Sequence, residues 1–238
     1  MFCKERITEE TGEAEILAII KESFSLALAK IEQAAAAAGH DDDQYDTTLA
    51  LAVYRNGILF FGNSGDSGIV VLKKDGSYTA VTEQQRDENG CVFPLCFGTE
   101  KWVFGKIENV ASILLATDGM YETLFPYLLR YQDVNIYVAL ARYMMAEDSL
   151  RFSELGSEAV QANMEAFIDN IPGEQVNDDK TVLVVLDTEI ATEPQPAEYY
   201  LAPDWAALKK RHDEEFRRAA YPHLYKDEVQ EKAEESDS

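Results

Sequence analysis

The spacing of apolar residues changes once, early in the chain, and this change restricts the possible folds more than any other feature. Between residues 13 and 38, apolar side chains recur every three or four positions, and Gly39 follows them. This pattern predicts one long amphipathic helix that ends at a glycine. The next residues form short β-branched or aromatic runs, with Asn56-Gly57 and Asp75-Gly76 between them. Both dipeptides favour the tight turns of antiparallel hairpins.

The later elements follow from the same spacing rules. Helices are expected over residues 121–146 and 154–171, the second ended by Pro172-Gly173. Residues 181–186 form a continuous apolar run, which indicates a central strand of a sheet. The predicted strands are 47–54, 58–62, 67–73, 78–82, 102–106, 113–117 and 181–186. The order of helix, antiparallel strands, helices and strand predicts an α+β fold built in layers.

Composition divides the chain into four segments. Residues 1–188 carry all of the predicted strands and are expected to form one α+β domain, and residues 189–203, which include three prolines, are predicted to be a linker. In residues 204–225 an aspartate precedes a stripe of apolar residues at helical spacing, which predicts an amphipathic helix that docks on the domain or on a partner. The tail 226–238 holds two lysines against six carboxylates and is predicted to be disordered.

The charge balance and the apolar runs exclude two classes of partner. The chain has 21 Lys plus Arg and 44 Asp plus Glu, a formal net charge of −23, whereas nucleic-acid binding needs a basic surface. The first ten residues form no signal peptide, and the longest apolar run, 110–116, is too short to cross a bilayer. We therefore expect a cytoplasmic protein with neither a nucleic-acid nor a membrane partner.

Two acidic segments lie next to predicted apolar strands. Asp118-Gly119 follows strand 113–117, and Asp178-Asp179 precedes strand 181–186. If these strands are antiparallel neighbours, Asp118 and Asp178 meet at one edge of the sheet. Clustered carboxylates repel one another unless a cation neutralises them, and ligation by oxygen alone suits Mg²⁺ or Mn²⁺. Each segment by itself is also explained as a turn, either an Asp-Gly turn after a strand or a solvated acidic turn.

Two other motifs suggest chemistry that the rest of the sequence does not support. Gly65-Asp66-Ser67-Gly68 matches the nucleophile segment of chymotrypsin-like proteases, but His40, the only histidine upstream, lacks the sequence context of a catalytic base. Residues 41–46 are rich in aspartate, yet they lack the glycine and glutamate positions of a calcium loop. We reject both interpretations.

Several segments taken in order resemble the type 2C, metal-dependent (PPM) serine/threonine protein phosphatases, and they are most similar to the bacterial branch of that family. The segments are Asp46-Thr47-Thr48-Leu49, residues 61–68, Thr82-Glu83-Gln84-Gln85, residues 114–120 and residues 178–185. The resemblance implies a sandwich of two mainly antiparallel sheets flanked by helices, with two or more Mg²⁺ or Mn²⁺ ions at one end. It also implies that a metal-activated water hydrolyses phosphoserine or phosphothreonine in protein substrates, and it suggests a cognate kinase as a partner.

The resemblance also assigns roles to individual residues. Asp118 and Asp178 correspond to metal-binding aspartates of the family, and Asp66 corresponds to the aspartate of an additional metal site. Asp179 stands where the family has asparagine. Asp179 and Gly119 are candidates for a metal contact or for support of the metal ligands.

The beginning of the sequence departs from the family pattern. Family members carry a phosphate-binding arginine, an acidic pair and a metal-bridging Asp-Gly before their first helices, whereas this sequence opens with Met1-Phe2-Cys3-Lys4. The interpretation that we favour is a phosphatase that is incomplete at its N-terminus, with activity impaired by the missing bridging aspartate. The alternative is a non-catalytic module of the same fold that binds phosphoproteins or kinases.

Overall fold

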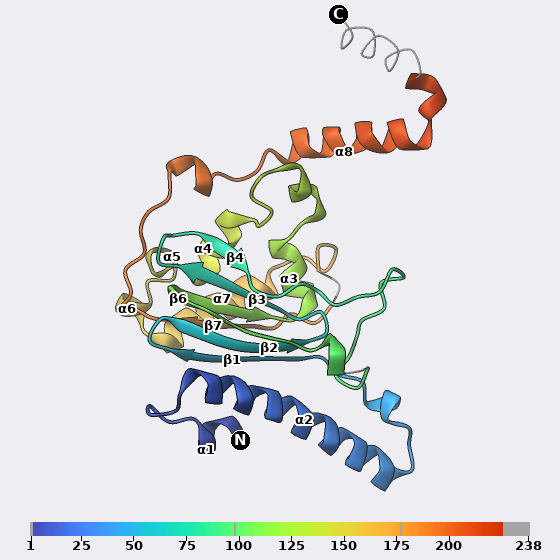
Figure 1. The fold of residues 1–238 in the computed structure, drawn as a ribbon. Coiled ribbons are helices and arrows are strands. Elements are labelled where there is room, and N and C mark those ends of the chain that lie inside the picture. Colours follow the sequence, from blue (N-terminus) through green and yellow to red (C-terminus); the bar gives the residue numbers. More distant parts are fainter. Residues whose placement is uncertain (1, 98, 177, 226–238) are drawn as a thin grey trace, which may run out of the picture.

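The computed structural model describes residues 2–97, 99–176 and 178–225, and it consists of two stacked antiparallel sheets with helices on both outer faces (Figure 1). The first sheet has the strand order β1-β2-β5 and the second has the order β4-β3-β6-β7. The strands are β1 (Leu49–Arg55), β2 (Ile58–Ser64), β3 (Gly68–Lys73), β4 (Tyr78–Ala80), β5 (Val103–Ile107), β6 (Val110–Ala116) and β7 (Val182–Leu186). The predicted α+β sandwich is confirmed.

The helices precede, interrupt and follow the strands along the chain. The α-helices are α1 (Phe2–Arg6), α2 (Glu13–Ala38), α3 (Asp118–Leu124), α4 (Val138–Met145), α5 (Glu147–Leu150), α6 (Phe152–Leu155), α7 (Ser157–Asp169) and α8 (Trp205–Ala220). The 3-10 helices are η1 (Asp42–Tyr45), η2 (Thr99–Lys101), η3 (Tyr127–Tyr131), η4 (Ala197–Tyr200) and η5 (Pro222–Tyr225). The long helix predicted over residues 13–38 has the predicted bounds and ends at Gly39, whose backbone is left-handed (φ 70°).

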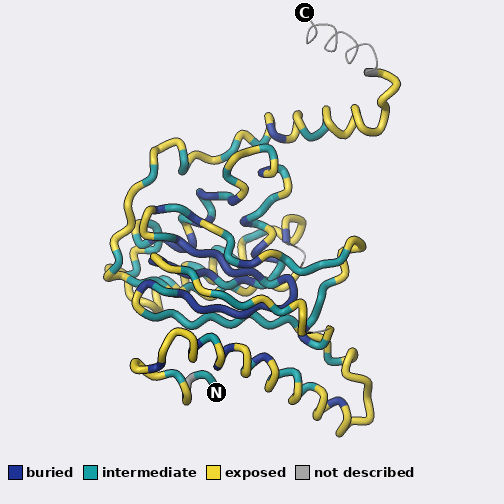
Figure 2. Tube along the Cα trace, in the orientation of Figure 1, coloured by how far each residue is buried: buried dark blue, intermediate teal, exposed yellow. Residues whose placement is uncertain are grey.

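Three apolar clusters fill the spaces between the four layers (Figure 2). Phe24 of α2 and Phe60 of β2 are buried between this helix and the first sheet. Leu59 and Ile113 lie between the two sheets. Leu114 belongs to the cluster that joins the second sheet to α3, α4 and α7. Adjacent residues of a strand belong to different clusters because their side chains point to opposite faces.

The predicted helix over residues 121–146 is wrong in its continuity. The chain there forms α3, η3 and α4, and Pro126 lies between the first two. Proline has no backbone N–H and cannot continue the helical hydrogen-bond pattern. The second predicted helix, 154–171, begins at Ser157 as α7, after Gly156 with a φ of 80°. These breaks divide the helical layer into short pieces.

The prediction that residues 181–186 form a central strand is also wrong. β7 pairs with β6 and lies at the end of its sheet, and within the described residues no strand pairs with its other side. Leu183 is consequently 54% exposed and Val185 is 37% exposed. A continuous apolar run indicates that a strand can be buried, but it does not indicate whether other strands pair with it on one side or on both.

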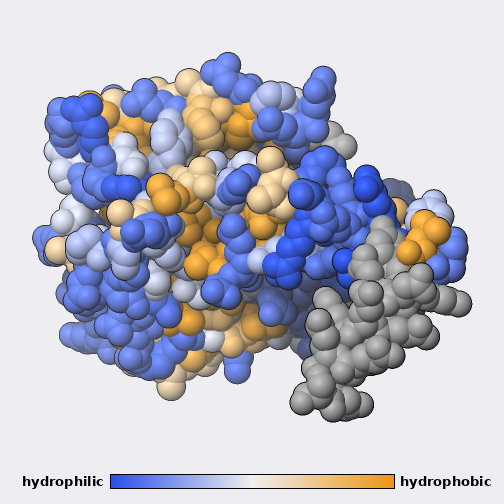
Figure 3. Space-filling model, turned by 90° about the horizontal axis from the view of Figure 1, so that it is seen from above, coloured by the Kyte–Doolittle hydropathy of each residue, from blue (hydrophilic) through white to orange (hydrophobic). Residues whose placement is uncertain are grey.

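The C-terminal segment runs back across the helical side of the domain. Tyr199 of η4 accepts a hydrogen bond from the backbone N–H of Tyr78 (2.9 Å) and stacks on its ring. α8 then extends away from the sheets (Figure 1). The tail 226–238, predicted to be disordered, lies outside the described residues. Figure 3 views the molecule from the side of α8 and shows a mostly hydrophilic surface with apolar side chains gathered near its middle.

Candidate functional site

Three sequence segments with predicted site residues meet at one end of the second sheet. β6 is antiparallel to β7, with Ala116 opposite Val182, and it is antiparallel to β3, with Ala116 opposite Gly68. The C-terminal end of β6 therefore lies beside the N-terminal ends of both neighbours. The condition that strands 113–117 and 181–186 be antiparallel neighbours is met. This arrangement brings together Asp66, Asp118 and Asp178.

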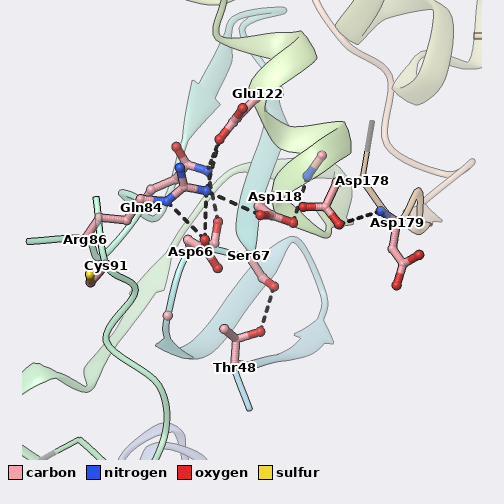
Figure 4. Close-up of polar contacts among 12 residues, drawn as sticks. Thr48, Asp66, Ser67, Gln84, Arg86, Cys91, Asp118, Glu122, Asp178 and Asp179 are labelled. Carbon is pink, nitrogen blue, oxygen red and sulfur yellow. Dashed lines mark hydrogen bonds and ion pairs between the residues drawn. The ribbon is translucent and has the colours of Figure 1, made fainter. Parts of the chain in front are cut away.

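Hydrogen bonds fix the backbone at this end of the sheet (Figure 4). Asp118 begins α3, and its Oδ1 accepts a hydrogen bond from the N–H of Gly119 (2.9 Å). The Thr117 hydroxyl donates to the carbonyl oxygen of Asp179 (2.9 Å) and accepts from the N–H of Thr181 (3.1 Å). Thr117 thus ties the segment that carries Asp118 to the segment that carries Asp178.

Arg86 is the cation of this site. Its Nη2 lies 2.8 Å from Oδ2 of Asp66, 3.3 Å from Oδ2 of Asp118 and 3.0 Å from Oε1 of Glu122. The Asp66 side chain is 6% exposed, whereas that of Arg86 is 31% exposed. A buried carboxylate needs a cation or several donors to offset its desolvation. Arg86 supplies that charge to Asp66.

The electrostatic balance at Asp118 is unfavourable for its charged form. Burial raises the pKa of the Asp118 carboxyl above its ordinary value, and the negative charges of Asp66 and Asp178 raise it further. The hydrogen bond from Gly119 and the charge of Arg86 act in the opposite direction but do not reverse the shift. The site therefore carries more negative charge than Arg86 alone neutralises, and an additional cation would be stabilised there.

Gly119 is required by close approach of the backbone. A Cβ atom at this position would lie 2.9 Å from the carbonyl oxygen of Asp179 and 3.3 Å from Cβ of Asp178. Any larger residue would push Asp178 and Asp179 away from Asp118. Asp179 contributes through its backbone, which contacts Thr117 and Asp178, whereas its carboxylate points away from Asp118 (Figure 4).

Two cavities adjoin the carboxylates, and both are lined by Asp118 and Asp178. The first is a hollow of about 420 Å³ that also includes Asp66 and the Thr48–Ser67 hydroxyl pair. The second has a volume of about 990 Å³ and extends from Arg86 towards α8. A ligand held at Asp118 would therefore have room on both sides.

The donors fit a hard divalent cation that keeps several waters. Among the described residues, no group of three or more His, Cys, Asp or Glu side chains is placed to hold a metal ion. Mg²⁺ commonly binds through only one or two carboxylates, with water and substrate phosphate completing its ligands. Asp118 and Asp178 offer this kind of donor set, and the excess negative charge favours a cation beside them. Among the described residues that line the two cavities there is no His or Cys, the nitrogen and sulfur ligands that zinc prefers.

The sequence did not reveal Arg86. It follows the predicted hairpin strand 78–82, and an isolated antiparallel bridge to Val92 holds its backbone. The excess of carboxylates at this edge of the sheet predicts a bound cation, and residues 82–85, just before Arg86, are among the segments singled out in the sequence. The loop path that brings Arg86 back to Asp66, 20 residues earlier in the chain, is a tertiary feature without a local sequence signal.

The chain is similar to proteins of known family over most of its length. A family model described as "Protein phosphatase 2C" matches residues 3–167. No curated protein matches the chain at a significant level.

No helix in the described part of the chain is long and apolar enough to cross a membrane.

The solved structures that are similar to this chain have low sequence identity to it. A bacterial serine phosphatase is 8% identical, with 81% of this chain and 76% of that chain covered and a TM-score of 0.50. The catalytic domain of the serine/threonine phosphatase PstP, solved with 2 manganese ions, is 17% identical, with 77% and 74% covered and a TM-score of 0.46. PppA of Pseudomonas aeruginosa, a regulatory component of T6SS, is 16% identical to this chain. The match covers 54% of this chain and 61% of PppA, with a TM-score of 0.42. The first of these likenesses shows a shared fold.

Proposed function

The chain belongs to the protein phosphatase 2C family, and on that premise we propose that it hydrolyses phosphoserine and phosphothreonine in proteins with the help of Mg²⁺ or Mn²⁺. The observation that supports this proposal best is the meeting of Asp66, Asp118 and Asp178 at one end of the second sheet. Its substrates would be phosphoproteins, and the kinase that produces them would be its functional partner.

Each residue of the site has a distinct task in this proposal. Asp118 and Asp178 hold the divalent cation, which when bound lowers the pKa of water and neutralises phosphoryl charge. Asp66 holds Arg86, or the additional ion that the family resemblance implies. Arg86 lines the larger cavity and is partly exposed, so its other N–H groups are placed to donate to phosphate oxygens. Gly119 and the backbone of Asp179 keep the two metal ligands together.

Metal binding is expected to be weak. In the described residues, no carboxylate bridges Asp118 and Asp178, and one oxygen of Asp118 already contacts Arg86. A cation must therefore bind mainly through water and must compete with a guanidinium for Asp118. This competition supports the expectation of impaired activity at low metal concentration.

Removal of divalent metal should abolish turnover. We expect hydrolysis of a phosphothreonine peptide to stop in the presence of a chelator and to return when Mn²⁺ or Mg²⁺ is added in excess. The measurement is phosphate release, with an unphosphorylated peptide as blank and the Asp118→Asn variant as the control for contaminating phosphatase. Turnover that is insensitive to the chelator would contradict the proposal.

Replacing Arg86 should make stability depend on metal. Arg86→Gln leaves the nearly buried Asp66 without its cation. Because the Arg86 side chain is itself partly exposed and water can take its place, we expect a loss of about 1–3 kcal/mol of unfolding free energy, less than the full cost of an unpaired buried charge. Because the variant also frees Asp118, Mn²⁺ should raise its melting temperature more than that of the unaltered protein. Thermal unfolding with and without Mn²⁺ measures both effects.

A matched control separates this effect from the general loss of an arginine. Arg151 pairs with Glu154 at the surface, where both side chains are more than half exposed, so Arg151→Gln should change stability by less than about 0.5 kcal/mol. An equal Mn²⁺-induced shift in Arg86→Gln, Arg151→Gln and the unaltered protein would show that Arg86 does not occupy a cation site.

A further inference from the structure

The larger cavity beside the carboxylates is lined by two chemically different sets of residues, which we call its charged end and its aromatic end. One end is formed by Asp118, Asp178, Glu122 and Arg86, the charged groups of the candidate site. The other end is lined by aromatic and apolar residues, namely Phe125, Pro126, Tyr127, Tyr137, Leu140 and Trp205. The cavity volume of about 990 Å³ is at the upper end of the range of sites that bind small molecules or peptide side chains. A ligand in this cavity can therefore contact charged and apolar side chains at the same time.

The aromatic end is held in place by the first half of α8. Trp205 begins this helix, and the Asp204 carboxylate caps it by accepting a hydrogen bond from the N–H of Ala207 (3.0 Å). The Trp205 ring meets the Tyr137 ring edge to face, with centroids 5.3 Å apart. Further along the helix, Leu208 is 7% exposed. The wall that contains Trp205 is thus anchored to the domain.

A second set of contacts joins α8 to η3. The His212 ring packs edge-on against Tyr127, with centroids 4.9 Å apart, and the Arg211 guanidinium donates to the carbonyl oxygen of Tyr131 (3.2 Å). Beyond these contacts the helix is exposed, and Phe216 is 63% exposed. The first half of α8 is therefore the part that packs on the domain, and its Trp205 lines the cavity. This helix lies outside the residues that match the family model.

The aromatic residues of this end are open to a ligand. Tyr127 is 55% exposed, and Tyr137 and Trp205 are half-buried, whereas aromatic residues that serve only the core are enclosed. Partly exposed aromatic rings that converge on a cavity are typical of sites that bind apolar groups. Among the described lining residues, three carboxylates at the charged end face one arginine. A phosphate there needs the proposed divalent cation beside it, whereas an acidic side chain at the aromatic end would have no cation to offset this repulsion.

We propose that the aromatic end binds a bulky apolar side chain of the substrate that lies close in sequence to the phosphorylated residue. This assignment rests on the proposed function, because it places the phosphate at Asp118 and Asp178. An extended peptide advances about 3.3–3.6 Å per residue, so a neighbouring side chain can enter the aromatic end while the phosphate stays at the charged end. The substrate class is a phosphopeptide with a leucine-like or aromatic side chain near the phosphoresidue.

Paired peptides test this assignment. Phosphothreonine peptides that differ only by leucine or serine, scanned over the positions flanking the phosphoresidue, should differ in kcat/KM by about tenfold at the position that reaches the cavity. Trp205→Ala should bring this ratio close to one, and Tyr127→Ala, at an exposed site, should lower it as well. Phe216→Ala, on the exposed half of the same helix, should leave the ratio unchanged. Equal kcat/KM values at every scanned position would overturn the proposal.

A binding measurement separates this proposal from the proposed function. Non-hydrolysable phosphonate versions of the same peptides are titrated calorimetrically into the full chain in the presence of Mn²⁺. Tighter binding of the leucine peptide that is lost in Trp205→Ala supports the pocket even if no peptide is hydrolysed, in which case only the phosphatase proposal fails. Equal affinity for the leucine and serine peptides, or no binding of either, contradicts the pocket whatever the turnover.

Discussion

Asp118→Asn is expected to reduce metal-dependent hydrolysis of a phosphothreonine peptide by about 10²–10³-fold, because a metal ion supplies several kcal/mol of transition-state stabilisation and each 1.36 kcal/mol is about tenfold in rate. Asp178→Asn should have an effect of similar size. The exchange of a carboxylate for an amide keeps the shape of the side chain and its acceptor for the Gly119 N–H. The fold should therefore be retained, which circular dichroism can verify.

Asp179→Asn is the matched comparison for both variants. It removes the same charge one position away from Asp178, but the Asp179 carboxylate points away from Asp118 (Figure 4), and its contacts with Thr117 and Asp178 are made by its backbone. Because this side chain makes no contact with either metal ligand in the described structure, we expect a loss of no more than about tenfold, the low end of the cost of changing a residue that supports a metal site. Full activity in both Asp118→Asn and Asp178→Asn would remove the basis of the proposed metal site.

Gly68→Ala is expected to lower the unfolding free energy by about 1–3 kcal/mol, the usual cost of forcing extra atoms into a packed core. A Cβ atom at Gly68 would lie 1.9 Å from the ring of Tyr121. This ring has little freedom to move, since Tyr121 is 5% exposed and its hydroxyl donates to the carbonyl oxygen of Thr82 (2.6 Å). Either β3 or α3 must shift, and α3 carries Asp118.

Thermal unfolding measures this effect, with Gly173→Ala as the control. A Cβ atom at Gly173 would meet no atom within 4 Å, so this substitution should change stability by no more than about 0.5 kcal/mol. For a chain of this size, each kcal/mol corresponds to a melting-temperature change of about 2–4 °C. If Gly68→Ala and Gly173→Ala melted at the same temperature, the close contact between β3 and α3 would be wrong.

The secondary structure could be predicted where its signals are local. The helix over 13–38 and the hairpin at Asn56-Gly57 depend on spacing and on turn residues that are adjacent in the chain, and both are present. The helical prediction over 121–146 holds only in part, because the chain there forms α3, η3 and α4 instead of one helix. Pro126 lies between α3 and η3 and interrupts the helix there.

Part of the candidate site could be predicted for the same reason. Asp118 and Asp178 border strands that pair directly, so their proximity follows from one assumption about neighbouring strands. No pattern in the sequence predicts that Arg86 or Trp205 lies at the site. Each reaches the site through a loop or a helix whose path is determined by contacts with distant segments, such as Asp66 for Arg86 and Tyr137 for Trp205.

The sequence by itself determined the class of fold, most of its elements and the acidic end of the second sheet. These features arise from periodicity, turn chemistry and strand pairing, which act between residues close in the chain or on adjacent strands. Only the tertiary structure decided that β7 is an edge strand, that Arg86 neutralises Asp66 and that Trp205 lines the larger cavity. The spacing of apolar residues indicates which side chains will be buried, but the residues that those side chains contact depend on how all the layers pack together.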